Sequence, residues 1–376
     1  MITKRWEIAS PAPDSLLRTY RGVSPIIAQL LYNRGLQTPE DANHFLYDRD
    51  VASTAGDPRQ MKDMQKAVER IRAAIKRREP IVVYGDFDAD GVTSTTLMVE
   101  ILRRLGANVQ AYIPHRVDEG YGLNTPALEE LARQGTSLVI TVDCGIRSVQ
   151  EVEDGKAAGL DMVITDHHSV GADIPNALAV VNPQQEDCPG DTSLAGVGVA
   201  YMVARALLLD AYQRNGKRKS HIVKYAEVLS DLLDLVAIGT VADIMPLNTP
   251  TNRAFVKHGL QVINEGRRPG VRALMEVAGI KPGQATAMSI GFGLGPRINA
   301  AGRLESAIIA YELLSAPNDE IAREHAAELQ RLNSKRQQLT RDAQERIREA
   351  IEFSRRDDDL LIFAVDEQVV PGIVGL

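Results

Sequence analysis

Short apolar runs and longer stretches with helical spacing alternate through the middle of the chain. The candidate strands are the apolar runs at 81–85, 109–113, 138–142, 162–165 and 179–181. The candidate helices between them lie at 93–105, 126–134 and 148–158. Repeated strand–helix units predict an α/β fold built on a doubly wound, mostly parallel sheet.

The chain on both sides of this region is predicted to be helical. Thr38 followed by Pro39 is a helix start, and 63–76 has the pattern of an amphipathic helix. Further along, apolar helices are expected to open at 194–201 and to cover 227–238, and a strand is expected at 360–365. We expect four regions: a helical segment at 1–75, the sheet with a helical part at 76–317, a long charged connector helix at 318–356, and the start of another unit at 357–376.

Composition narrows the protein class. With 44% apolar and 25% charged residues, the chain has the make-up of a globular protein. A net charge of −7 argues against indiscriminate binding of polyanions, but an acidic protein can still carry a basic groove. No apolar run approaches the ~20 residues that span a bilayer, so no membrane association is expected. The two cysteines, Cys144 and Cys188, do not suggest a disulfide framework, and the expected location is cytoplasmic.

Three aspartates follow the first predicted strand at every second position. If the extended form persists, Asp86, Asp88 and Asp90 lie on one side of the chain, and Gly91 then allows a turn. Three clustered carboxylates repel one another unless protons or a cation intervene. The pattern therefore predicts one or two divalent metal ions.

This motif has two simpler interpretations. The same spacing begins a calcium-binding EF-hand loop, but the twelfth position, where that loop needs a glutamate, is Leu97. That interpretation fails. Solvated turn aspartates remain an alternative, since Asp favours turns.

Further polar residues lie near the ends of other predicted elements. Asp143 follows the third strand, His167 and His168 follow the fourth, and Asp243 follows the helix at 227–238. Ligands of open parallel sheets bind at the carboxyl ends of the strands. Carboxylates with imidazoles and without thiolates suit Mn²⁺ or Mg²⁺, and two ions sharing an aspartate can promote attack on phosphorus. Each residue taken alone has a simpler explanation: Asp143 could be a turn residue, either histidine could be a core residue, and Asp243 could be an ordinary loop acid.

These motifs resemble those of the DHH phosphoesterase family, which is named for the triplet Asp166, His167 and His168. The resemblance rests on segments 86–94, 142–145, 165–168 and 241–243. Segments 113–123, 194–200 and 295–304 look like the bacterial branch of single-strand-specific 5′→3′ DNA exonucleases. The match runs from about Leu30 to the C-terminus, with the motifs in the family's order.

The resemblance implies roles for individual residues. The implied catalytic set is Asp86, Asp88, Asp90, Asp143, His167, His168 and Asp243. Asp88 and Asp143 would hold one ion, and the second would be held by Asp90, Asp143, His167 and Asp243. Asp86 would either bind a metal ion directly or accept a hydrogen bond from a residue that does. His168 would face the scissile phosphate.

Nucleic-acid contacts are implied for five further residues. They are Arg116 near the 5′ phosphate, Tyr121 as a stacking face, and Arg297, Asn299 and Arg303 along the strand's path. Arginine forks match phosphate, and an aromatic face accepts any base. Ordinary surface ion pairs remain an alternative for Arg116 and Arg303.

The implied function is a metal-dependent exonuclease that releases mononucleotides from single-stranded DNA in repair and recombination. A single-strand-binding protein and a helicase are candidate partners that the sequence does not identify. One alternative is a family phosphodiesterase of short oligonucleotides or cyclic dinucleotides, and another is a non-catalytic DNA-binding or scaffold relative. Because the family continues into a DHH-associated domain after such a connector helix, we expect residues 357–376 to be the start of a truncated copy. A chain truncated in this way would be expected to bind DNA more weakly than a full-length one and to retain the metal chemistry.

Overall fold

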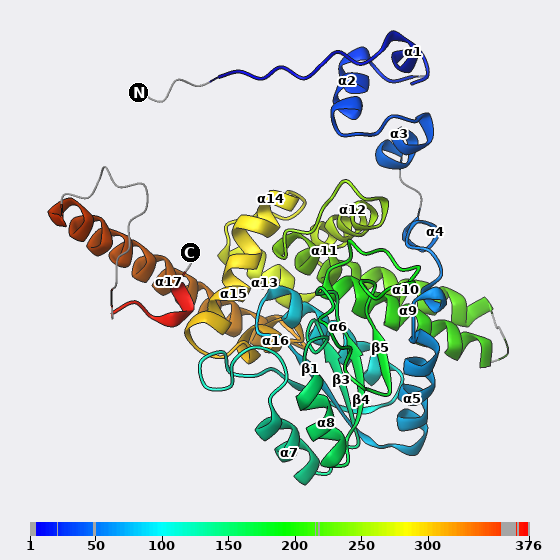
Figure 1. Ribbon diagram of the computed structural model, residues 1–376, viewed down its shortest axis with the longest axis vertical. Helices are drawn as coiled ribbons and strands as arrows, with labels where there is room; N and C mark the ends of the chain where they lie inside the picture. Colours follow the sequence, from blue (N-terminus) through cyan, green and yellow to red (C-terminus); the bar gives the residue numbers. More distant parts are fainter. Residues whose placement is uncertain are drawn as a thin grey trace.

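A five-stranded parallel sheet forms the centre of the fold (Figure 1). The computed structural model describes residues 5–20, 22–47, 50–214, 216, 219–354, 366 and 368–374. The sheet has the order β2-β1-β3-β4-β5, with β1 (Pro80–Gly85), β2 (Asn108–Tyr112), β3 (Leu138–Val142), β4 (Asp161–Thr165) and β5 (Ala179–Val181). The predicted α/β class is confirmed, and every predicted strand agrees with an observed one to within a residue at each end.

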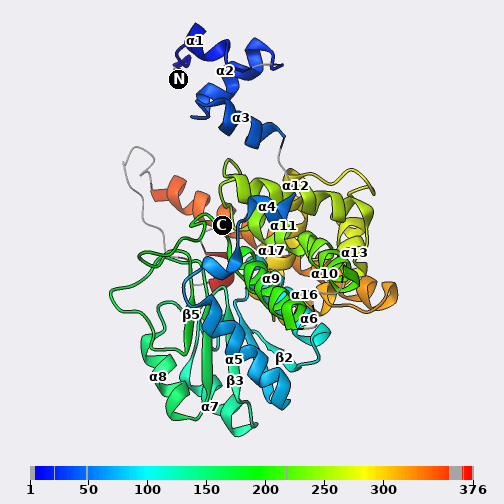
Figure 2. The ribbon, with the colours of Figure 1, turned by 90° about the vertical axis from the view of Figure 1, so that its right-hand side faces the viewer.

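Helices cover both faces of the sheet. One face carries α5 (Met64–Arg77), α6 (Ala89–Arg104) and α9 (Gly196–Arg214), and the other carries α7 (Thr125–Arg133) and α8 (Val149–Ala157). Figure 2 shows α5 lying along the sheet. Alternate residues of β1 divide between the faces: Ile81 and Val83 join the first core, and Val82 and Tyr84 join the second. This alternation follows from the two-residue repeat of a strand.

The C-terminal part is helical and shares the first core with the sheet. Its elements are α10 (Lys219–Asp231), α11 (Leu233–Ala242), α12 (Pro250–Glu265), α13 (Pro269–Val277), α14 (Ala287–Ser289), the π-helical turn η2 (Ile290–Leu294), α15 (Gly295–Leu304), α16 (Ile308–Leu314), α17 (Asp319–Ser354) and the 3₁₀ turn η3 (Pro371–Ile373). The shared core extends from Val51 to Leu332 on α17. The region limits drawn from the sequence stay a prediction.

The first helices form a small unit of their own. They are α1 (Asp14–Leu17), α2 (Pro25–Asn33) and α3 (Pro39–Leu46), followed by α4 (Val51–Thr54) and the 3₁₀ turn η1 (Pro58–Gln60). A small apolar cluster around Tyr20, Ala28 and Leu31 holds α1, α2 and α3 together, apart from the sheet in Figure 1, whereas Val51 of α4 belongs to the shared core. The Thr38 hydroxyl accepts a hydrogen bond from the Asp41 amide, which confirms the predicted helix start.

Two predicted helices differ from the observed ones. The helix expected from residue 93 begins at Ala89, because the Asp88 side chain caps it, so the extended form ends at Asp88. The single helix expected at 227–238 is two, α10 and α11, with Leu232 between them. Almost all of α11 is buried, whereas the described part of α10 lies largely at the surface. The strand expected at 360–365 lies outside the described residues.

None of the helices in the described part of the chain combines the length and the apolar character needed to cross a membrane.

Candidate metal centre

The turn from β1 into α6 places three aspartates at one point. Asp86 is buried directly after the strand, and Oδ1 of Asp88 accepts hydrogen bonds from the amides of Asp90 (2.9 Å) and Gly91 (3.0 Å). A Cβ at Gly91 would lie 2.4 Å from the Asp86 carbonyl oxygen. Only glycine therefore allows α6 to approach the end of β1 this closely, and the role of Gly91 is close packing rather than a turn.

Asp143 enters the same space from the end of β3. Its φ of +61° lies in the left-handed region, which aspartate tolerates better than most residues. Its amide donates to the Thr165 carbonyl of the neighbouring strand. The chain order reverses between β1 and β3, which is where open sheets of this order bind ligands.

Asp166 organises the two histidines after β4. Its buried carboxylate accepts from the amides of Ile146 (2.9 Å), His167 (2.7 Å) and His168 (3.1 Å), and lies 2.8 Å from Nδ1 of His168. In the sequence, Asp166 stands out only as part of a motif. Its position between the strand and the two candidate histidines was the feature of the sequence that could have indicated its role.

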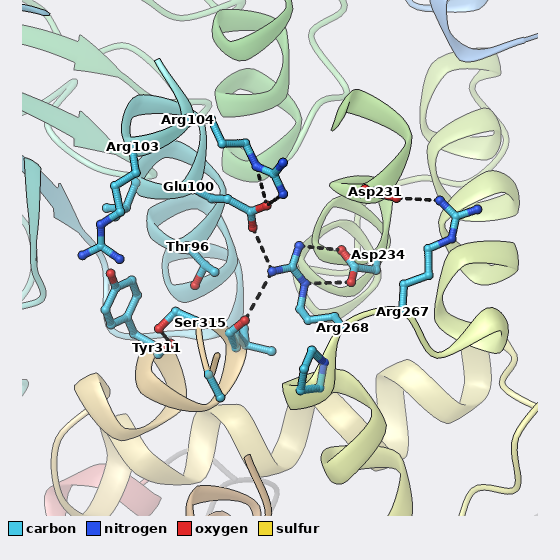
Figure 3. A pocket seen from close by; sticks show the side chains of 14 residues that line it. Thr96, Glu100, Arg103, Arg104, Asp231, Asp234, Arg267, Arg268, Tyr311 and Ser315 are labelled. Atoms are coloured by element: carbon cyan, nitrogen blue, oxygen red, sulfur yellow. Dashed lines mark hydrogen bonds and ion pairs between the residues drawn. The ribbon is translucent and has the colours of Figure 1, made fainter. Parts of the chain in front are cut away.

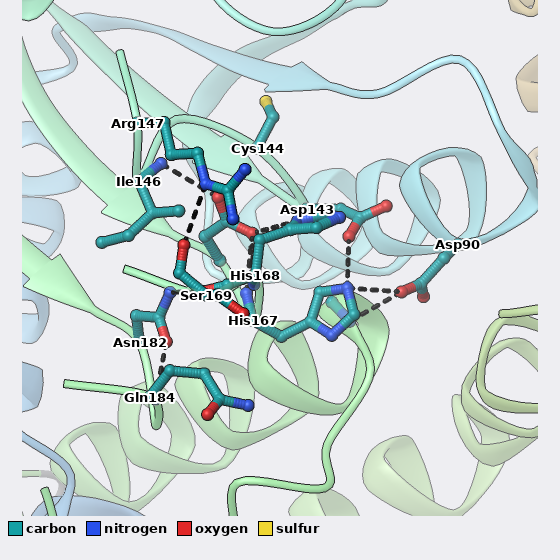
Figure 4. A network of polar contacts seen from close by, with 12 residues as sticks. Asp90, Asp143, Cys144, Ile146, Arg147, His167, His168, Ser169, Asn182 and Gln184 are labelled. Carbon is teal, nitrogen blue, oxygen red and sulfur yellow. Dashed lines mark hydrogen bonds and ion pairs between the residues drawn. The ribbon is translucent and has the colours of Figure 1, made fainter. Parts of the chain in front are cut away.

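His167 points toward the carboxylates of Asp143 and Asp90 (Figure 4), and Asp243 also lies near its ring. Its Nε2 lies 3.1 Å from Oδ1 of Asp143, 3.6 Å from Asp243 and 3.8 Å from Asp90. Asp243 caps the C-terminal end of α11, and Asp90 lies in the first turn of α6. Side chains from three other parts of the fold therefore converge on one imidazole.

The start of α9 holds Asp90 in place. The carboxylate of Asp90 accepts from the amides of Gly196 (2.6 Å) and Val197 (2.9 Å), as favoured at a helix N-terminus. A Cβ at Gly196 would lie 2.5 Å from Oδ1 of Asp143, and one at Gly239 would lie 2.6 Å from Oδ1 of Asp90. Both helices reach the centre only because these positions are glycines.

All seven predicted catalytic residues meet at this centre. Ligand atoms within 4.8 Å of one another form three groups: Asp86, Asp88 and Asp143; Asp90, His167 and Asp243; and Asp143, His167 and His168. Asp143 belongs to two of the groups. This arrangement is compatible with the predicted division of ligands between two ions.

The electrostatics of the centre fit a divalent cation. Burial and the neighbouring Asp88 raise the pKa of Asp86 to about 8, and the same two causes raise the pKa of Asp243 to about 6. Burial raises the pKa of Asp143 and lowers that of His167. The buried atoms Oδ1 of Asp86, Oδ1 of Asp143 and Nε2 of His167 make no hydrogen bond to any described residue. Oxygen and imidazole donors of this kind suit Mn²⁺ or Mg²⁺.

Three of the predicted nucleic-acid residues lie near the centre. The Arg116 guanidinium lies 4.8 Å from the centroid of the Phe87 ring, and Tyr121 is 57% exposed with its hydroxyl 3.5 Å from the His168 ring nitrogens. Arg303 donates to the Gly372 carbonyl (2.9 Å). Tyr121 and His168 also line a cavity of about 460 Å³ together with Asp86 and Asp88.

A further arginine, Arg336 of α17, was not among the predicted nucleic-acid residues. Burial, then Arg116 and Arg336, lower the pKa of Arg303, while Asp88 raises it, so these charges lie close together. None of the three arginines forms an ion pair with a carboxylate among the described residues. Nothing in the sequence distinguishes Arg336 from the other arginines of this charged helix.

The other two predicted residues make internal contacts. The Arg297 guanidinium donates to Gln330 (2.8 Å) and to the carbonyls of Gly293 (2.7 Å) and Val277 (3.3 Å). Oδ1 of Asn299 accepts from the Ala89 amide (2.7 Å) at the start of α6. Their observed contacts brace helices, and contact with a nucleic acid stays a prediction for both.

Known proteins resemble the chain over most of its length. The family model described as "DHH family, N-terminal domain" matches residues 80–240. The single-stranded-DNA-specific exonuclease RecJ of Bacillus subtilis is 40% identical over 99% of this chain and 45% of the relative. The RecJ of Dickeya dadantii is 39% identical over 97% of this chain and 62% of the relative. The chain thus spans about half the length of the curated relatives it matches.

Two solved structures show the same fold. A manganese-bound exonuclease RecJ is 34% identical, with a TM-score of 0.72 over 84% of this chain and 76% of that chain. RecJ of Thermus thermophilus, in complex with Mn²⁺, is 30% identical with a TM-score of 0.79 over 99% of this chain and 51% of that chain. Together with the matching motifs, these similarities show that the chain belongs to the DHH family, in its RecJ branch.

Proposed function

We propose that the protein is a metal-dependent exonuclease that hydrolyses single-stranded DNA from the 5′ end to mononucleotides. The observation that carries the proposal is the position of Asp143, which shares its carboxylate between two groups of candidate ligands. The relatives named above are single-stranded-DNA-specific exonucleases, and two of the similar structures hold manganese. The cytoplasm is the proposed location, and a single-strand-binding protein and a helicase are the proposed partners.

Two ions would be held by different residues of the centre. Asp88 and Asp143 would hold one, with Asp86 beside them. The other would be held by Asp90, His167 and Asp243, together with Asp143, whose Oδ1 lies 3.1 Å from His167. When bound, such a pair lowers the pKa of a water molecule and stabilises negative charge on phosphate oxygens. The backbone amides of α9 and the carboxylate of Asp166 fix the orientation of Asp90 and His168 before substrate arrives.

His168 is proposed to bind the phosphate that reacts. Its hydrogen bond with Asp166 raises the pKa of the imidazole, which favours the protonated form. A protonated imidazole beside the carboxylates can donate a hydrogen bond to a phosphate oxygen. The 41% exposure of its side chain leaves the ring accessible from the cavity.

The arginines and Tyr121 are proposed to hold the strand. Arg116, Arg303 and Arg336 have no carboxylate partner among the described residues, so a phosphate would supply the missing negative charge. Tyr121 offers an exposed ring on which a base can stack without regard to sequence. This cluster favours a nucleic-acid substrate over a small phosphoester that would need only the metal centre.

Hydrolysis of labelled DNA tests the proposal. We would compare a single strand, the matching duplex and di- to pentanucleotides, each with Mn²⁺, Mg²⁺ or chelator. We expect metal-dependent release of mononucleotides from the 5′ end of the single strand, lost in Asp143→Asn and retained in Asp173→Asn, which changes an exposed loop acid.

Two other outcomes would contradict the proposal. Hydrolysis confined to di- to pentanucleotides would indicate an oligonucleotide phosphodiesterase. DNA binding without hydrolysis at any metal concentration would indicate a binding or scaffold protein.

A further inference from the structure

A second cavity lies away from the metal centre, beside the C-terminal half of α6 (Figure 3). Its volume is about 360 Å³, within the range of about 300–1,000 Å³ that is usual for small-molecule sites. Asp90 lies in the first turn of α6 and Arg103 in its last turn, which places the cavity about 15–20 Å along the helix from the metal centre. The remaining walls come from α10, α11, α13 and α16.

Three arginines in the wall are already paired with carboxylates. Arg268, almost fully buried, contacts Glu100 (2.9 Å) and Asp234 (2.8 Å). Arg104 contacts Glu100 (2.7 Å), and Arg267 contacts Asp231 (2.5 Å). These pairs use all three acidic side chains of the wall, so the network of ion pairs leaves no carboxylate for a fourth arginine.

The fourth arginine, Arg103, lies beside a buried hydroxyl. No carboxylate of the described residues lies within ion-pair distance of Arg103. Its guanidinium faces the hydroxyl of Tyr311, a residue that is 8% exposed (Figure 3). The side chains of Arg103 and Ser315 lie close to that hydroxyl, but neither forms a hydrogen bond of normal geometry with it. Because burial raises the pKa of Tyr311, the phenol keeps its proton and can donate it to an acceptor.

We propose that this cavity binds a phosphate monoester with an apolar or planar group, of the nucleoside monophosphate class. A phosphate oxygen can accept from both the guanidinium of Arg103, which is exposed, and the buried hydroxyl of Tyr311, so it would pair the cation and supply the acceptor that the hydroxyl lacks. Inorganic phosphate would leave much of the cavity empty, and the partly exposed ring of Pro269 offers an apolar contact for the rest of the molecule. The site does not rest on the proposed function.

Calorimetric titration of the full chain in chelator tests the site. The probes are thymidine monophosphate, thymidine and inorganic phosphate at equal ionic strength. We expect the monophosphate to bind more tightly than either part alone. Its affinity should fall about tenfold in Arg103→Gln and about threefold to tenfold in the nearly isosteric Tyr311→Phe. Arg133→Gln, an exposed arginine of α7, serves as the control that leaves affinity unchanged.

Several outcomes would overturn the assignment. They are no binding of the monophosphate at millimolar concentration, unchanged affinity in both variants, or loss of binding in Arg116→Gln instead, which would place the ligand at the other arginine cluster. Equal affinity for inorganic phosphate would refute the proposed ligand class. DNA hydrolysis measured on Arg103→Gln and Tyr311→Phe is expected to stay at the parent rate, so a failure of this site is distinguishable from a failure of the exonuclease proposal.

Discussion

Nε2 of His167 lies 3.1 Å from Oδ1 of Asp143, and neither atom makes a hydrogen bond to a described residue. Two buried polar atoms this close, each without a donor–acceptor partner, are costly in a folded protein. A cation that both atoms can ligate would offset that cost. The pair therefore marks the centre as built for an ion rather than for internal hydrogen bonding.

Replacement of Asp143 by asparagine should separate function from folding. Because burial and the neighbouring acids raise the pKa of Asp143, the charged form destabilises the metal-free protein. In Asp143→Asn we expect a melting temperature in chelator no lower than that of the parent, with DNA hydrolysis lowered at least about a hundredfold. Thermal melts and rate assays on the same preparation check this. A marked loss of stability in chelator would show that Asp143 is structural.

Manganese should stabilise the fold through the same residue. A ligand that binds only the native state at 100 times its Kd adds about 2.7 kcal/mol to the free energy of unfolding. We expect Mn²⁺ to raise the melting temperature of the parent, reversibly with chelator, and to leave Asp143→Asn nearly unchanged. An equal rise in both proteins would place the ion elsewhere.

Gly196 should be required for the geometry of the centre although it supplies no ligand atom. In Gly196→Ala the new Cβ would meet Oδ1 of Asp143 at 2.5 Å, so the carboxylate or α9 must move. We expect Mn²⁺ affinity and hydrolysis to fall by about 10–100-fold, as for residues that orient metal ligands. Gly198→Ala, whose Cβ would meet only the side chain of Leu194 at 3.2 Å, is the matched control. Similar losses in both variants would point to general damage of α9.

Arg336 should act on substrate binding rather than on the metal ions. We expect Arg336→Gln to raise KM for single-stranded DNA about tenfold and to reduce the slope of log affinity against log salt by about 0.7. Mn²⁺ binding should not change. Arg341→Gln, an exposed arginine of the same helix, should leave both quantities at parent values. If kcat falls at unchanged KM, Arg336 does not serve as a phosphate contact.

The sheet could be predicted from sequence because each strand is a short apolar run with polar residues at its end. The convergence of Asp86, Asp143 and His167 followed from the parallel arrangement alone, since the carboxyl ends of such strands meet at one edge. Contacts between distant segments could not be predicted in this way. The amides of α9 that hold Asp90, more than 100 residues earlier, belong to this class.

Two further differences between the predicted and the observed structure also arise from contacts that the local sequence pattern does not reveal. The approach of Arg336 to Arg303 depends on the packing of α17 against α15, which no local pattern encodes. The early start of α6 depends on the Asp88 side chain turning back to cap the helix, while the alternation of aspartates favoured an extended chain.

The number of manganese ions bound per chain tests the central claim most directly. Equilibrium dialysis with metal analysis, on the parent and on Asp143→Asn, would give that number without reference to activity. Because Asp143 is placed between two groups of ligands, we predict two ions for the parent and loss or marked weakening of both in the variant. A single ion in the parent, or two ions bound equally well by the variant, would contradict the shared site.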